Sequence, residues 1–206
     1  MSLSPRNHRK QPTARQGTGS VQSDEELIAA YAGGDERAAR QIADRLLPPV
    51  LSLARYMLSD PAEAEDVAQE TLLRLWKLAP NWEAGRAKPE TWAYRVAANL
   101  CTDRLRRRKR ISGEEVPEQE DDTPGAEAQL GEADRAAALR AALATLPERQ
   151  RLALVLRHFQ DHSQAQIAEV MEISEEAVES LLARGKRSLA ATLESRRAAL
   201  SLETGS

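Results

Sequence analysis

The sequence predicts an all-α protein in which an acidic, flexible linker joins two small helical domains. Ala, Leu, Arg and Glu dominate the 206 residues and favour helices, and no run of alternating β-branched and aromatic residues predicts a strand. The length fits two domains near the lower end of the usual size of about 100 to 150 residues. We expect a disordered basic arm at 1–22, a first helical domain at 23–110, the linker at 111–129, a second, helix-turn-helix domain at 130–197 and a tail at 198–206.

Charge is segregated along the chain, so the net charge of -3 describes no single part of it. The first 20 residues hold four basic residues and no acid, whereas residues 111–134 hold nine acids and no base. A run of one sign is typical of a solvated spacer. The alternative is that the acidic run competes with nucleic acid for a channel in a partner.

The cysteine count and the hydropathy indicate a cytoplasmic protein with no membrane partner. Cys101 is the single cysteine, which excludes an internal disulfide and a cysteine-based zinc site, and we expect it to be a small buried thiol. No apolar run approaches the roughly 20 residues of a membrane span, and the N-terminus lacks the apolar stretch of a signal peptide.

Capping signals mark the first two helices. Ser23 and Glu26 have the spacing of a capping box, and the helix that they open should end at Gly33-Gly34. Asp35 can cap the next helix. Pro48-Pro49 should bend or break that helix before the chain continues, because proline removes helical hydrogen bonds.

The third helix should begin at Asp60-Pro61, an N-cap followed by a first-turn proline, and reach about Leu78. Its inner side consists of Ala64, Val67, Ala68, Thr71, Leu75 and Leu78. Its outer side consists of Asp66, Gln69, Glu70, Leu73, Trp76 and Lys77. Leu73 and Trp76 are then apolar groups among charges, which is typical of the centre of a protein interface. The alternative is that a neighbouring helix covers both.

A fourth helix, over 89–110, combines an apolar side with a tryptophan on its polar side. The inner positions are Ala93, Tyr94, Ala97, Ala98, Cys101 and Leu105, and the outer positions are Trp92, Arg95, Asn99, Thr102, Asp103 and Arg106. An exposed indole beside Arg and Asn is a candidate platform for an unstacked base. Six of the seven residues at 104–110 are basic, which suits a phosphate backbone. The alternative is an amphipathic helix with a solvated face and a stray tryptophan.

The second domain reads as four helices. An alanine-rich helix should reach about Thr145, and another should run from Pro147 to about Phe159. Ser163 and Ser174 then cap a short and a longer helix on either side of the turn at 171–174, a pattern typical of a helix-turn-helix that places its second helix in a DNA major groove. A purely structural helical hairpin is the alternative.

Four motifs in order resemble bacterial RNA polymerase sigma factors of the extracytoplasmic-function group: AEAEDVAQETLLRLWK, TWAYRVAANLCTDRLRRR, LPERQRLALVLRHF and IAEVMEISEEAVESLLARGKRSL. The resemblance implies a first domain that binds the polymerase clamp and the promoter minus-10 element. It implies a second domain that binds the polymerase flap and the minus-35 element. The partners implied are core RNA polymerase, promoter DNA and an anti-sigma factor.

The resemblance assigns roles to three sets of residues. Polymerase binding falls on Asp66, Gln69, Glu70, Leu73, Trp76 and Lys77, and the opened minus-10 strand on Trp92, Arg95, Asn99, Asp103 and Arg106. The recognition helix over 174–187 gives Ser174, Glu176, Glu179, Ser180, Arg184 and Arg187 as contacts to the minus-35 duplex. The chain departs from the family pattern at Glu172, where many members have glycine, and at Ala177, Glu179 and Leu181, where Thr, Lys and Arg are common.

Two other functions compete with this interpretation. One is a sigma-like protein that titrates an anti-sigma factor without reading DNA, which Glu176, Glu179 and Leu181 would suit. The other is a helix-turn-helix regulator that works without polymerase. We expect no catalysis, no cofactor and no metal, because the sequence has no phosphate loop or paired nucleophile and its His158 and His162 lack a third ligand of the right kind; we expect both to be exposed at a helix end.

Overall fold

The computed structural model describes residues 22–112 and 132–203, and all regular elements in these stretches are helical, as predicted. The elements are α1 (Asp24–Ala32), α2 (Glu36–Leu58), α3 (Pro61–Leu78), the short 3₁₀ helix η1 (Ala79–Asn81), α4 (Pro89–Ser112), α5 (Glu132–Ala144), α6 (Glu148–Phe159), α7 (Gln164–Met171) and α8 (Glu175–Glu203). The basic arm expected at 1–22 and the linker expected at 111–129 lie, apart from their ends, outside the described residues.

The capping signals are confirmed. Ser23 and Glu26 form a complete capping box at the start of α1, and Asp35 accepts from the N–H of Arg37 at the start of α2. Asp60 accepts from two backbone N–H groups in the first turn of α3. Each cap satisfies N–H groups that have no partner inside the helix, so these helices start where their sequences specify.

Helix α2 contradicts the expected break at Pro48-Pro49, because it continues through both prolines to Leu58. The two prolines remove two backbone donors in the middle of the helix. Leu46 and Val50, which flank the pair, are both buried in the core. Burial on both sides of the prolines offsets the lost hydrogen bonds and holds the helix in one piece.

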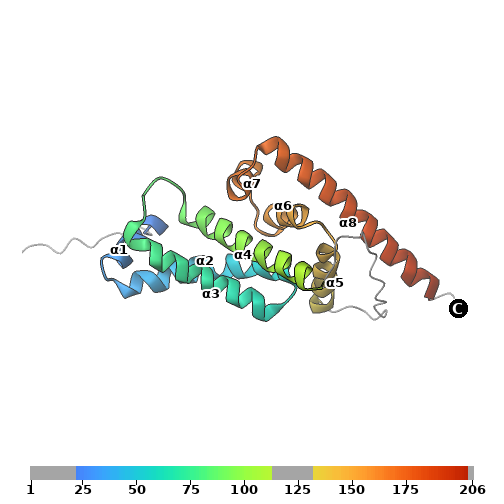
Figure 1. Cartoon of the computed structure of the whole chain (residues 1–206), viewed down its shortest axis with the longest axis horizontal. Coiled ribbons are helices and arrows are strands. Elements are labelled where there is room, and N and C mark those ends of the chain that lie inside the picture. The colour runs from blue at the N-terminus through green and yellow to red at the C-terminus, as the bar shows by residue number, and fades with distance from the viewer. Residues whose placement is uncertain (1–21, 113–131, 204–206) are drawn as a thin grey trace, which may run out of the picture.

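Helices α2, α3 and α4 pack together and form the core of the first region, with α1 at one end (Figure 1). The inner side of α3 is buried as predicted except for Leu78, which is half-buried. On α4, Ala93, Tyr94, Ala97, Ala98 and Cys101 are buried, while Leu105 is half-buried. The expected division of both helices into an inner and an outer side is therefore confirmed in the main.

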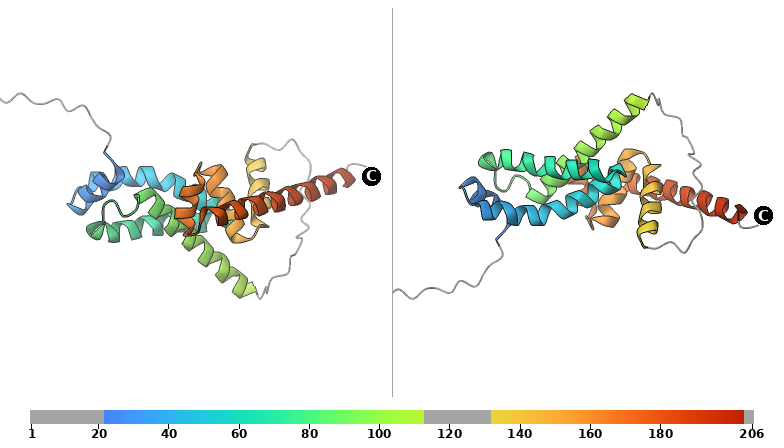
Figure 2. Two further views of the ribbon diagram at one scale, coloured as in Figure 1. Left: turned by 90° about the horizontal axis from the view of Figure 1, so that it is seen from above. Right: turned by 90° about the horizontal axis from the view of Figure 1, so that it is seen from below.

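Helices α5 to α8 form the second region, where α7 and α8 make the helix-turn-helix. Gly185 lets α8 lie against α6, because a Cβ built there would meet the Leu154 Cδ1 atom at 3.0 Å. Helix α8 runs to Glu203, beyond the expected domain end at 197, and extends away from the rest of the molecule (Figures 1 and 2).

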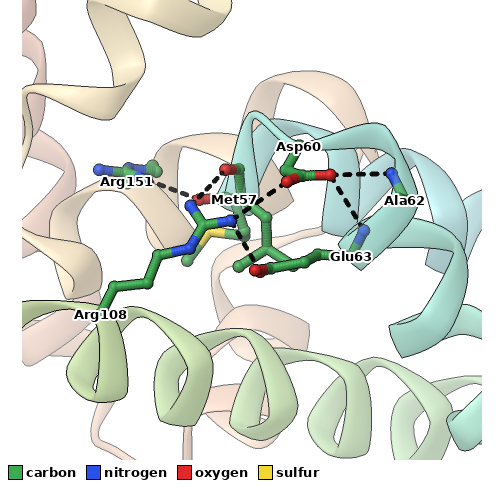
Figure 3. A network of polar contacts seen from close by, with 7 residues as sticks. Met57, Asp60, Ala62, Glu63, Arg108 and Arg151 are labelled. Atoms are coloured by element: carbon green, nitrogen blue, oxygen red, sulfur yellow. Dashed lines mark hydrogen bonds and ion pairs between the residues drawn. The ribbon is translucent and has the colours of Figure 1, made fainter. Parts of the chain in front are cut away.

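The two regions are docked, and two arginines meet at the end of α2. Arg151 of α6 is 5% exposed and donates to the carbonyl oxygen of Met57 at 2.6 Å. Arg108 of α4 donates to the next carbonyl, that of Leu58, at 3.2 Å and pairs with Glu63 at 2.8 Å and Asp60 at 3.6 Å (Figure 3). Cations at a helix C-terminus also interact favourably with its dipole. One helix end thereby ties α3, α4 and α6 together.

Candidate nucleic-acid and polymerase interface

A groove of about 560 Å³ lies between α3 and α4. It is lined by Asp66, Gln69, Glu70, Leu73 and Arg74 from α3 and by Leu100, Asp103, Arg104 and Arg107 from α4. Four of the six residues predicted to bind polymerase are thus brought together, and one predicted minus-10 residue, Asp103, joins them.

Leu73 is the apolar feature of this groove. Its side chain is 51% exposed, so no neighbouring helix covers it. Glu70 beside it accepts a hydrogen bond from Arg74 Nε at 2.8 Å, and this bond holds the pKa of Glu70 below its ordinary value. The groove therefore offers a partner an exposed apolar contact within a charged rim, the usual composition of a protein interface.

Trp76 and Lys77 lie outside the groove. The Trp76 ring is half-buried against Tyr31 of α1, with ring centroids 4.8 Å apart, so the sequence interpretation of Trp76 as a protruding anchor is wrong in part. Helix α1 provides the cover, and its position was not evident from the periodicity of α3. Lys77 is exposed.

The polar side of α4 begins with a pair of tryptophans. Trp92 is half-buried, and its ring meets the ring of Trp82 edge-on at 6.1 Å between centroids. Trp82 comes from the loop after η1, so this loop holds the indole of Trp92 in place. The expectation of a freely exposed indole is therefore corrected to a supported one. Asn99 and Asp103 further along the same side are exposed.

The basic side chains at the end of α4 point in two directions. Arg106, Arg107, Lys109 and Arg110 line a hollow of about 680 Å³ together with Asp103. Arg108 instead points to the α2–α3 corner, where it pairs with Asp60 and Glu63 (Figure 3). One of the six basic residues expected to hold phosphate is therefore a structural contact of the first region.

Helix α8 displays all six of its predicted contact residues. Ser174, Glu176, Glu179, Ser180, Arg184 and Arg187 are exposed. Ser174 Oγ accepts from the N–H of Ala177 at 3.3 Å, as expected of a cap. The pKa of Glu176 lies below its ordinary value, because its own backbone N–H and then Ser174 hydrogen-bond to the carboxylate. Leu181, by contrast, is buried. It therefore adds nothing to the surface that would suit a sigma-like protein that titrates an anti-sigma factor without reading DNA.

Several contacts between the two regions escaped sequence reasoning. Tyr94 donates to Gln160 Oε1 at 2.8 Å, and Gln160 in turn donates to Ser52 at 3.0 Å. His162, expected to be exposed, is buried with its ring edge-on to Tyr94 at 4.5 Å. The only sequence signal for these contacts was a glutamine and a histidine at the end of an apolar helix, and it did not identify their partners.

Across 22–112 and 132–203, no three His, Cys, Asp or Glu side chains are grouped so that they could hold a metal ion. In the same stretches, none of the helices combines the length and the apolar character that a membrane span requires.

Comparison with known proteins identifies the two regions. The family Sigma-70 region 2 matches residues 42–111, and the family Sigma-70, region 4 matches residues 136–189. The ECF RNA polymerase sigma factor SigM of Mycobacterium tuberculosis is 33% identical over 171 residues, which are 83% of this chain and 85% of that protein. The chain belongs to the extracytoplasmic-function group of the sigma-70 family.

Solved structures agree with the fold of this sigma factor. The chain of CnrH, solved in complex with the cytosolic domain of CnrY, superposes with a TM-score of 0.64 at 24% identity and covers 84% of this chain and 99% of its own length. The sigma factor RpoE of Bartonella quintana, solved with the anti-sigma factor NepR, gives a TM-score of 0.58 at 22% identity over 75% of this chain and 96% of its own. The protein is thus a promoter-recognising initiation factor for RNA polymerase and not an enzyme.

Proposed function

We propose that the groove between α3 and α4 is the surface of this sigma factor that binds core polymerase, with Leu73 at its centre. The observation that carries the proposal is that a half-exposed leucine stands among four charged or polar residues from the same helix. Burial of such an apolar contact drives association, while the charged rim sets the orientation of the partner. Trp76 and Lys77, which lie outside the groove, contribute less.

The polar side of α4 is the segment that holds the opened minus-10 strand. Trp92, supported by Trp82, supplies a ring on which a base can stack, and Asn99 beside it can hydrogen-bond a base edge. Arg95 and Arg106 supply charge for phosphates. The exposed face of α8, from Ser174 to Arg187, reads the minus-35 duplex. The protein does this work in the cytoplasm, where the polymerase is.

An anti-sigma factor is the proposed regulatory partner. The solved relatives CnrH and RpoE both carry a bound protein, which in the RpoE structure is named as an anti-sigma factor. Their similarity to this chain concerns the fold alone, so capture of a partner from the native host, and its competition with polymerase, is the test of this part of the proposal.

Reconstitution with bacterial core RNA polymerase tests the main proposal. The holoenzyme should retain promoter fragments from a genomic library and give specific runoff transcripts from them. Leu73→Ala should weaken core binding by about fivefold, the usual effect of losing an interface anchor. Ile111→Ala is the matched control, because Ile111 is 80% exposed on α4 and does not line the groove. Equal losses in both variants would refute the groove as the binding surface.

Trp92 provides the matching test for the minus-10 role. Trp92→Ala should lower runoff transcription about tenfold or more, since base stacking contributes about 1 to 3 kcal/mol. Trp92→Phe keeps a ring and should recover part of the loss. Permanganate reactivity of unpaired thymines in the open complex should fall in parallel, while binding to core polymerase stays unchanged. Normal strand opening by Trp92→Ala would refute the proposed role of Trp92 in holding the minus-10 strand.

A further inference from the structure

The turn between α7 and α8 holds a residue in a conformation that glycine would adopt more easily. Glu172 has φ 54° and ψ 49°, in the left-handed region. A side chain with a Cβ atom is disfavoured there, and glycine is the usual residue at such a helix end. The backbone of Glu172 therefore has a conformational cost, which favourable contacts of the side chain can offset.

The side chain of Glu172 reaches the first region of the molecule. Its Oε1 atom lies 3.1 Å from Nη1 of Arg95 on α4, and Nη2 of the same guanidinium donates to the carbonyl oxygen of Glu169 at 3.0 Å. Arg95 thus holds both the negative end of α7 and the carboxylate that follows it. We call this set of three residues the Arg95–Glu172 clasp, with the Glu169 carbonyl as its third member.

A second carboxylate from the other region meets α4 further along. Glu148, at the first position of α6, lies 3.0 Å from Lys109 Nζ and 4.0 Å from Arg106 Nε. Two of the five residues predicted to hold the minus-10 strand, Arg95 and Arg106, are therefore paired with acids of the second region. In this arrangement carboxylates of the second region pair with cations that are proposed to bind the phosphates of the minus-10 strand.

The clasp lies at the edge of a better-buried interface. In that interface the rings of Phe159 and Tyr56 stack with their centroids 4.1 Å apart, and the Tyr94 hydroxyl donates to Gln160. The side chains of Arg95 and Glu172 themselves remain 30% and 65% exposed. An ion pair of this exposure adds little energy and is screened by salt, so it adjusts an equilibrium that other contacts dominate.

We propose that Glu172 is an intramolecular competitor of promoter DNA for Arg95. In the free sigma factor the clasp closes the second region over the polar side of α4, and separation of the regions releases Arg95 for the opened strand. The proposal rests on the role proposed above for α4. It gives a reason for a glutamate at a position in the turn that favours glycine: its carboxylate shifts the equilibrium toward the closed state.

The closed state can be measured directly in the free chain by single-molecule energy transfer. Labels on Glu36→Cys and Ala190→Cys, both exposed, report the separation of α2 and α8. The native Cys101 is buried and its pKa is raised to about 12 by burial, so it does not compete for the label. Glu172→Gln should raise the open population about two- to fivefold, the range expected for one exposed ion pair. At about 0.5 M salt, the unmodified chain should approach the variant.

Two further variants separate charge from backbone effects. Glu169→Gln is the matched control and should leave the open population unchanged, because Glu169 binds Arg95 through its backbone carbonyl. Glu172→Gly removes the carboxylate and relaxes the turn, so it should open the molecule like Glu172→Gln while its urea midpoint is equal to or above that of the parent. A closed population that Glu172→Gln leaves unchanged, or that Glu169→Gln lowers equally, overturns the clasp.

Competition with DNA has its own readout. Fluorescein-labelled oligo(dT) of 12 nucleotides should bind Glu172→Gln about two- to fivefold more tightly than the parent chain, and Glu169→Gln as the parent does. Opening without a gain in affinity would refute competition for Arg95. Neither the energy-transfer assay nor the oligo(dT) assay contains polymerase or a promoter. A failure of the transcription tests above can therefore be told apart from a failure of the clasp.

Discussion

Helices α4 and α8 carry the two sets of proposed DNA contacts, and the closed chain presents them in opposite ways. On α8 all six residues are exposed, although the face begins with acids and becomes basic only at Arg184 and Arg187. On α4, three cations, Arg95, Arg106 and Lys109, are paired with carboxylates of the second region, and the Trp92 ring packs edge-on against Trp82. The face proposed to read intact duplex is open, whereas the face proposed to hold a single strand is partly covered.

The difference suggests an order of events. A duplex needs no opening of the protein, so α8 can meet it in the closed state. The melted strand is proposed to need Arg95 and Arg106 of α4, and these two lose their acidic partners only when α6 and the turn after α7 move away. Core polymerase, which we propose binds the groove between α3 and α4, is the expected agent of that separation. The predictions below disturb either the docking of the two regions or one of the two faces, beginning with the largest effect.

Removal of Arg151 should have the largest effect on the docked state. Arg151→Ala removes the side-chain donor from the carbonyls of Met57, Ala144 and Leu146, of which the bonds to Met57 and Leu146 are buried, and should lower the free energy of unfolding by about 3 kcal/mol. Urea denaturation followed by circular dichroism measures this loss. Arg149→Ala, a change at an exposed position two residues earlier in α6, should stay within about 0.5 kcal/mol.

Arg108 allows a comparison with Arg151 at the same helix end. Arg108→Ala removes ion pairs to Asp60 and Glu63 whose side chains are one-third to one-half exposed, so the loss of unfolding free energy should be only about 1 kcal/mol. All these partners belong to the first region, so the energy-transfer distance between α2 and α8 should not change. An increase in this distance in Arg108→Ala would mean that the α2–α3 corner itself controls docking.

The local structure of this sigma factor was predictable from the sequence because caps act over three or four residues. Ser23, Asp35 and Asp60 each determine a helix start through a hydrogen bond to a backbone N–H in the next turn. The unbroken α2 was not predictable, since the burial that stabilises Pro48-Pro49 comes from other helices. The exposure of the outer residues of α3 and α8 followed from helical periodicity, except for Trp76, which α1 covers in part.

The site was predictable only as far as each helix face could be considered alone. Periodicity identified the outward residues of α4, but it could not show that Glu148 and Glu172 would face them across more than 40 residues of intervening sequence. His162 shows the same limit, because its burial against Tyr94 depends on how the regions dock. The replacement of a turn glycine by Glu172 was the one visible signal, and its meaning required the structure.

The exposed face of α8 should show a smaller and purely electrostatic effect. Arg184→Ala removes one cation from the face, so the slope of log K against log salt for duplex binding by the holoenzyme should fall in magnitude by about 0.9. Glu176→Gln should raise the affinity for duplex DNA, because it removes a carboxylate that is ionised at neutral pH and repels phosphate. A variant of Arg184 that alters base preference without altering the salt slope would assign it to base recognition instead.

The smallest effect is expected at Cys101, on the buried side of α4. It tests whether Glu172→Gln only separates the two regions or also loosens the packing of the first region. Burial raises the pKa of Cys101 to about 12, so the thiol stays neutral and unreactive in the folded state. In the unfolded chain a thiol ionises near pH 8.5, so stability is unaffected below this pH and falls as pH rises toward 12, where the unfolded state releases a proton that the folded state keeps. Alkylation of Cys101 by iodoacetamide at pH 8 should therefore be equally slow in the parent chain and in Glu172→Gln, because the clasp lies on the opposite side of α4. A faster reaction in Glu172→Gln would show that the variant exposes the core, and its energy-transfer change would then report unfolding and not release of Arg95.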